Sequence, residues 1–139
     1  NLGCFYVVLL LSRSGENISL DDLSGLAKRA PLLAFTLAVS AFSLAGIPPT
    51  GGFTGKLFLF TSAFKAGHLN IVIIGAVNTV ISIFYYLNLV RMSYSKEPIR
   101  TDPIRLSFHE KALCYVLICL VLYLGLMPFG LMQLFRAAV

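Results

Sequence analysis

Apolar runs alternate with short polar connections along the chain, and this pattern predicts an all-α bundle of transmembrane helices. A helix needs about 20 mainly apolar residues to cross about 30 Å of hydrocarbon. Residues 69–91 are predicted to form one transmembrane helix, and residues 112–135 another with a tail. Residues 1–12 are apolar but too short to span, so we interpret them as the end of a truncated helix. The chain is therefore expected to be a C-terminal fragment of a longer protein.

Residues 31–66 are predicted to form a single broken transmembrane helix. Two apolar runs, 31–47 and 53–66, are each short for a span but together cross the bilayer at about 1.5 Å per residue. Between and beside them stand residues that interrupt a helix or allow unusual dihedrals: Gly46, Pro48, Pro49, Gly51 and Gly52. The break should face the protein interior, where neighbouring helices or water satisfy its backbone groups.

Two polar connections separate the predicted spans. In residues 13–30, leucines recur at helical spacing ahead of Lys28 and Arg29, which favours a short amphipathic helix at the membrane surface. An ordinary solvated loop is the alternative. Residues 92–111 form the second connection, which carries two prolines and several basic residues.

Composition supports the membrane assignment. The chain is 58% hydrophobic and 12% charged, with a mean hydropathy of +0.85. A soluble domain of 139 residues could not bury that much apolar surface. The net charge of +5 does not indicate nucleic acid as a partner, because most basic residues fall in the connections between spans.

The distribution of basic residues predicts the orientation in the membrane. The long connections hold eight of the eleven lysines and arginines: Arg13, Lys28, Arg29, Arg91, Lys96, Arg100, Arg105 and Lys111. The opposite side holds only Lys65 and Arg136. By the positive-inside rule the long loops are cytoplasmic and the C-terminus is outside. The expected location of this integral protein is a bacterial inner membrane.

Lys56 is the main candidate for chemistry. A charged lysine at the centre of a membrane helix costs about 2.5–3.5 kcal/mol, so such residues usually serve ion or proton transport. Hydroxyl groups of Ser43, Thr50 and Thr54 could extend a path for protons beside it. The alternative is that Lys56 extends to the membrane interface and the two prolines mark a surface turn.

The remaining polar residues give weaker signals. Asn78 and Ser82 lie one turn apart on the predicted 69–91 helix and could line a hydrated path, although such residues more often bond between helices. His68 could form a proton exit, although a solvated turn is the simpler interpretation. No phosphate loop, catalytic triad, haem or iron–sulfur spacing is found, so no metal or cofactor ligands are predicted on this chain.

The residues around the break carry a family resemblance. Residues 42–56, FSLAGIPPTGGFTGK, closely resemble the broken twelfth helix of subunit N of respiratory complex I, and residues 83–87 and 2–5 also resemble that subunit. The resemblance implies spans eleven to fourteen of a fourteen-helix, antiporter-like subunit. It also implies that Lys56 corresponds to the family's intramembrane lysine, on the central hydrophilic axis and the proton exit route.

The resulting expectation is a proton-translocating membrane-arm subunit of NADH:quinone oxidoreductase. NADH, FMN, iron–sulfur clusters and quinone are then expected on partner subunits, and this chain contacts other membrane-arm subunits, lipid and protons but no nucleic acid. Three alternatives stay open. They are a cation/proton antiporter subunit, a related ferredoxin- or hydrogen-linked complex, and a scaffold in which Lys56 only pairs with a buried carboxylate.

Overall fold

Helices make up all the regular secondary structure of the residues described by the computed structural model, which are 1–12, 20–95, 104 and 106–127. The elements in chain order are α1 (Leu2–Leu11), the 3₁₀ turn η2 (Leu20–Leu23), α2 (Leu26–Arg29), α3 (Pro31–Ala45), α4 (Gly51–Lys65), α5 (Leu69–Ser95) and α6 (Phe108–Leu126). The predicted all-α class is confirmed.

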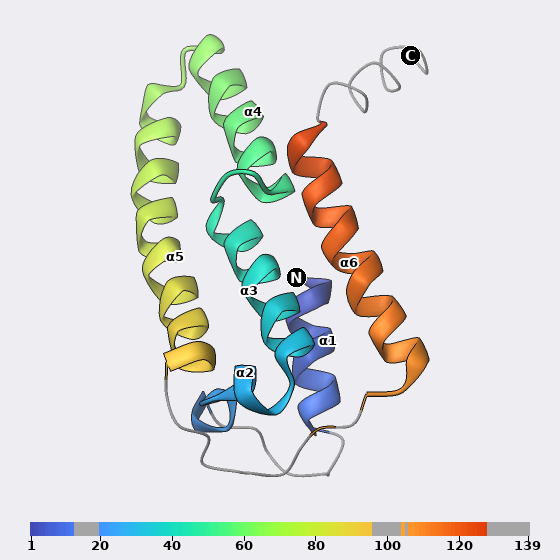
Figure 1. Cartoon of the computed structure of the whole chain (residues 1–139). Helices are drawn as coiled ribbons and strands as arrows, with labels where there is room; N and C mark the ends of the chain where they lie inside the picture. The colour runs from blue at the N-terminus through green and yellow to red at the C-terminus, as the bar shows by residue number, and fades with distance from the viewer. Residues whose placement is uncertain (13–19, 96–103, 105, 128–139) are drawn as a thin grey trace.

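α3 and α4 are the two halves of a discontinuous helix, as predicted. Each has 15 residues, or about 22 Å at 1.5 Å per residue, which is less than the hydrocarbon thickness. They follow one another along the middle of the bundle, with α5 on one side and α6 on the other (Figure 1). α5 and α6 each contact both halves, so α3 and α4 are packed against the same two flanking helices.

α5 and α6 are long and apolar enough to cross a membrane. α5 continues to Ser95, beyond the predicted end at residue 91, and Gly25 N–H donates to the carbonyl of Met92 in this added turn. α6 begins at Phe108 rather than at residue 112, because the Ser107 N–H donates to Oε2 of Glu110 (2.7 Å) and so starts the helix earlier. Residues 96–103 and 105 of the second connection, and the predicted tail at 128–135, lie outside the described residues.

The first connection enters the protein core. Its described part consists of η2 and α2, separated by Gly25 in a left-handed conformation (φ 67°), instead of one continuous amphipathic helix. Leu23 and Leu26 are buried, in a cluster that also contains Val7 and Leu33. Gly25 breaks the helical register, and burial of these leucines packs the segment against the helices that carry Val7 and Leu33. Residues 13–19 lie outside the described residues.

Much of the remaining surface is apolar. No residue in the most apolar window of α5 is buried, and Ile74, Val80 and Phe84 are each about 70% exposed. An apolar surface of this extent is stable only when lipid or other transmembrane helices cover it.

Candidate functional site

The end of α3 leaves two main-chain carbonyls without backbone donors. Gly46 adopts φ +83°, and its N–H donates to the carbonyls of Phe42 (2.9 Å) and Ser43 (3.2 Å). The Ile47 N–H returns to Phe42 as well (2.9 Å), which completes a Schellman-type helix end. The carbonyls of residues 44 and 45 would normally accept from residues 48 and 49. Both of those are prolines, which have no N–H.

Lys56 supplies the missing donors. Its Nζ donates to the carbonyl oxygens of Leu44 (2.9 Å) and Ala45 (3.0 Å), across the break and onto the other half of the helix. An ammonium group has three donors, and a cation is favoured at the C-terminal end of a helix by the helix dipole. The charge that the sequence places beside the Pro-Pro pair therefore caps the helix that the pair interrupts.

The beginning of α4 is held by α3 in return. The Gly52 N–H donates to Oγ of Ser43 (3.1 Å), and Oγ1 of Thr50 donates to the carbonyl of Ile47 (2.6 Å). A Cβ added at Gly52 would overlap the carbonyl oxygen of Ser43, so this contact requires glycine. Side chains of the two halves thus satisfy the carbonyls of Leu44 and Ala45 and the N–H of Gly52. The sequence analysis assigned these groups to neighbouring helices or water and did not identify the contacts between the two halves.

Gly125 of α6 also lies against the break, and the sequence analysis did not identify it. A Cβ there would overlap the carbonyl of Pro49, and the Gly125 carbonyl accepts a hydrogen bond from Oγ1 of Thr54 (3.3 Å). Gly51 is similarly close to Leu124, where an added Cβ would lie 2.9 Å from the leucine Cβ. An isolated glycine inside an apolar span is the sequence signal that could have revealed this close approach.

The structure gathers some of the predicted polar residues and leaves others apart. Ser43, Thr50, Thr54 and Lys56 lie together at the break. The other three predicted residues, Asn78, Ser82 and His68, lie away from the break. Oγ of Ser82 donates to the carbonyl of Asn78 within α5 (2.8 Å), and Asn78 is exposed. His68 is exposed at the turn between α4 and α5, at the far end of the bundle from α2.

Candidate metal ligands are not grouped in the described part of the chain. No cluster of three or more His, Cys, Asp and Glu side chains within it could hold a metal ion.

Gly46→Ala is expected to destabilise the protein for two reasons: the left-handed backbone conformation of residue 46 and the contact of the new Cβ with Lys56. A left-handed residue with a Cβ costs about 1–2 kcal/mol, and the new Cβ would lie 2.9 Å from Cδ of Lys56. Gly67→Ala is the matched control, because Gly67 has φ +80° and an added Cβ there meets nothing within 4 Å. Thermal unfolding of the two purified full-length variants should show a larger loss for Gly46→Ala. Equal losses would mean that the Lys56 contact contributes nothing.

Comparisons with known proteins identify relatives of this chain. The family model described as "NADH:quinone oxidoreductase/Mrp antiporter, TM" matches residues 1–82. A protein of Solidesulfovibrio magneticus named NADH-quinone oxidoreductase subunit N 2 is 48% identical over 136 residues, which is 96% of this chain and 28% of that protein. The protein of the same name from Opitutus terrae is 46% identical, over 91% of this chain and 27% of its own length.

A solved structure resembles the fold. Respiratory complex I from Thermus thermophilus with bound aureothin contains a chain that matches with a TM-score of 0.73 and 27% identity, over 91% of this chain and 31% of that chain. The present chain thus spans less than a third of the length of the relatives it matches.

Proposed function

Because the chain belongs to the NADH:quinone oxidoreductase/Mrp antiporter transmembrane family, we propose that it is part of a proton-translocating, subunit N-like component of an NADH:quinone oxidoreductase. The observation that carries the proposal is the pair of hydrogen bonds from Lys56 Nζ to the carbonyls of Leu44 and Ala45 at a helix break. An amine in that position can bind a proton inside the membrane bundle and lose it again.

The protonation state of Lys56 is coupled to the geometry of the break. The charged amine makes charge-assisted hydrogen bonds, which are stronger than neutral ones, to the negative end of α3. Loss of the proton weakens both bonds and leaves the α3 carbonyls less well satisfied. In the proposed mechanism, quinone reduction elsewhere in the complex changes the electrostatic field along the membrane arm. That change moves a proton from Lys56 toward the outside.

The hydroxyl groups at the break have a mainly structural part in this proposal. Thr50 and Thr54 donate their single O–H to the carbonyls of Ile47 and Gly125, so neither is free to donate a proton onward without first breaking that bond. Ser43 accepts from Gly52, and no hydrogen bond donated by its own O–H is found among the described residues. Lys56 is therefore the proposed carrier, and Ser43 is the best placed of the three hydroxyls to assist it.

The proposed orientation places the end of the bundle with α2, the end of α5 and the start of α6 in the bacterial cytoplasm. Lys28, Arg29, Arg91 and Lys111 belong to that end, whereas Lys65 closes α4 at the opposite end (Figure 1). This distribution of basic residues supports the proposed orientation by the positive-inside rule. The proposed partners are the other membrane-arm subunits and lipid, with NADH, FMN, iron–sulfur clusters and quinone on partner subunits.

A second candidate is a subunit of a cation/proton antiporter. The observation that favours it is the family description, which covers both oxidoreductase and Mrp antiporter proteins. The two candidates differ in their energy source: electron transfer drives the first, and an ion gradient drives the second.

Reconstitution of the full-length protein with its natural partners in sealed vesicles tests the proposal. Addition of NADH and a quinone should generate a proton gradient, visible with a pH-sensitive dye, to the same extent in sodium and potassium buffers. Sodium-driven proton movement that needs neither NADH nor quinone would overturn the proposal in favour of the antiporter.

A further inference from the structure

The first turns of α4 supply hydrogen-bond donors to the ends of two other helices. α6 ends at Leu126, so the carbonyl of Gly125 belongs to its last turn, where carbonyls have no donor within the helix. Oγ1 of Thr54 donates to this carbonyl (3.3 Å). Lys56, two residues further along α4, donates to the two carbonyls that end α3. The side chains of α4 therefore cap the C-terminal ends of both α3 and α6.

Two faces of α4 make these contacts. Successive helical residues are about 100° apart, so Gly51 and Thr54 share one face while Gly52 and Lys56 share another. The first pair contacts α6, since a Cβ added at Gly51 would lie 2.9 Å from the Cβ of Leu124. The second pair contacts the last turn of α3. The start of α4 is thus held between the end of α3 and the end of α6.

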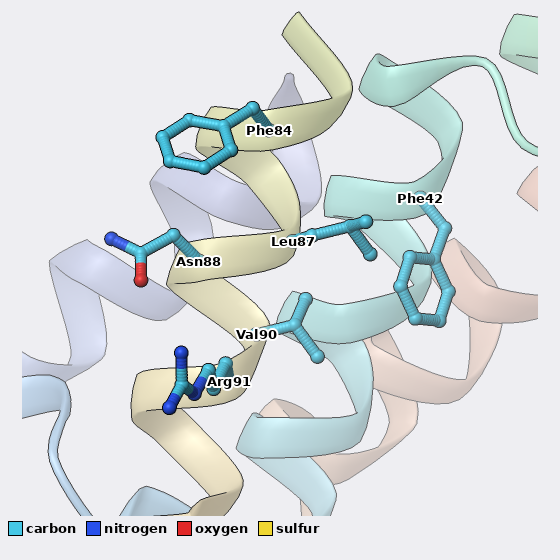
Figure 2. A pocket seen from close by; sticks show the side chains of 6 residues that line it. All are labelled: Phe42, Phe84, Leu87, Asn88, Val90 and Arg91. Carbon is cyan, nitrogen blue, oxygen red and sulfur yellow. The ribbon is translucent and has the colours of Figure 1, made fainter.

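α5 meets the neighbourhood of the break in a different way. Leu87 and Val90 of α5 point toward Phe42 of α3, so this contact is made by side chains (Figure 2). At α6 the neighbour is main chain, because a Cβ added at Gly125 would overlap the carbonyl oxygen of Pro49. Side chains can change rotamer when a helix shifts, whereas two main chains in contact have no such freedom. α6 therefore restricts the position of the break more tightly than α5 does.

We propose that Thr54 is a positioning residue for proton transfer at Lys56, because its bond to Gly125 fixes the start of α4 against the end of α6. This inference rests on the proposed function of Lys56 as the proton carrier. The Lys56 stem lies close against Gly46, where an added Cβ would be 2.9 Å from Cδ, so it has little room to compensate for a shift of α4. A shift of about 0.5 Å would take its bonds, now 2.9 and 3.0 Å, beyond the usual limit of about 3.2 Å.

Thr54→Val tests the inference in the full-length protein, assembled with its natural partners in sealed vesicles. Valine resembles threonine in shape but has no O–H to donate. The measurement is NADH-driven proton uptake divided by quinone reduction. Because a typical hydrogen bond shifts an equilibrium about fivefold, this proton-to-electron ratio should fall by about half or more of the decrease that Lys56→Met causes. Thr54→Ala removes the same donor without adding a methyl group and should give a similar fall. Thr54→Ser keeps the hydroxyl and should keep the wild-type ratio.

Thr61→Val is the matched control. Thr61 is on the same helix, is exposed, and donates to the carbonyl of Leu57 within α4 (2.7 Å). Its loss should leave the proton-to-electron ratio unchanged.

A purely structural function of Thr54 would lower the amount of assembled protein and leave the ratio normal. That result, an equal fall in Thr61→Val, or a low ratio in Thr54→Ser would each overturn the inference, while a reduced ratio in Lys56→Met would still support the proton carrier. A normal ratio in assembled Lys56→Met would instead overturn the proposed function, and this inference with it.

Discussion

Lys56→Met is expected to abolish proton translocation through this chain. The ratio of protons translocated to electrons transferred should therefore fall by the number of protons that this chain carries. Methionine has a similar length but no exchangeable proton and no hydrogen-bond donor. The carbonyls of Leu44 and Ala45 also lose their partner, and since these hydrogen bonds are part-buried, each loss costs about 1 kcal/mol. The measurement is NADH-driven proton uptake in vesicles, divided by the rate of quinone reduction.

Lys56→Arg separates transport from capping. A guanidinium keeps the positive charge and the donors that cap α3, but arginine does not lose its proton in proteins. The arginine variant should therefore assemble with nearly wild-type stability and still translocate fewer protons per electron. Stability and transport then respond differently to the two substitutions, which no purely structural function of Lys56 would produce.

Lys65→Met is the matched control for these variants. Lys65 is in the last turn of the same helix, is exposed, and is absent from the hydrogen bonds at the break. It should leave the proton-to-electron ratio unchanged. Wild-type pumping by an assembled Lys56→Met protein would contradict the relay and favour the scaffold, in which Lys56 serves only to hold the break together.

The location of the break could be predicted because its cause is local. Two consecutive prolines lack N–H groups and cannot continue a helix, and glycine at position 46 permits the left-handed residue that ends one. Helix lengths of about 15 residues on each side then require two segments for one span. Each of these steps depends on neighbouring residues and needs no knowledge of tertiary contacts.

The partners of the free backbone groups could not be predicted in the same way. The sequence shows that residues 44 and 45 lose their donors, but it does not show that Lys56 turns back across the break to replace them. Gly125 is 71 residues away from its partner Thr54, and no periodic pattern connects the two. Burial of Leu23 and Leu26 likewise depends on where α1 and α3 lie, which amphipathic spacing alone does not specify.

Gly52→Ala and Gly55→Ala are expected to have opposite effects, although the two glycines are one turn apart on α4. The break depends on close approach of α4 to the last turn of α3. An added Cβ at Gly52 would overlap the carbonyl oxygen of Ser43, and backbone cannot move aside as a flexible side chain can. At Gly55 an added Cβ meets nothing within 4 Å.

Relief of the overlap at residue 52 requires α4 to move away from α3, and that movement breaks the bond from the Gly52 N–H to Ser43 and lengthens those from Lys56. Loss of several such bonds, at about 1 kcal/mol each, together with the packing change, gives an expected destabilisation of about 3 kcal/mol or more. Gly55→Ala should instead stabilise the protein slightly, by up to about 1 kcal/mol, because alanine is the better helix former.

Unfolding of the two full-length variants in detergent, together with proton translocation in vesicles, provides the comparison. If Gly52→Ala is as stable as Gly55→Ala, the two halves do not touch as closely as Ser43 and Gly52 indicate. Coupling between the halves predicts one further result: where Gly52→Ala still assembles, it should lower the proton-to-electron ratio without altering Lys56 itself. A destabilised variant with a normal proton-to-electron ratio would contradict this coupling. It would show that Lys56 can exchange its proton without its hydrogen bonds to the carbonyls of Leu44 and Ala45.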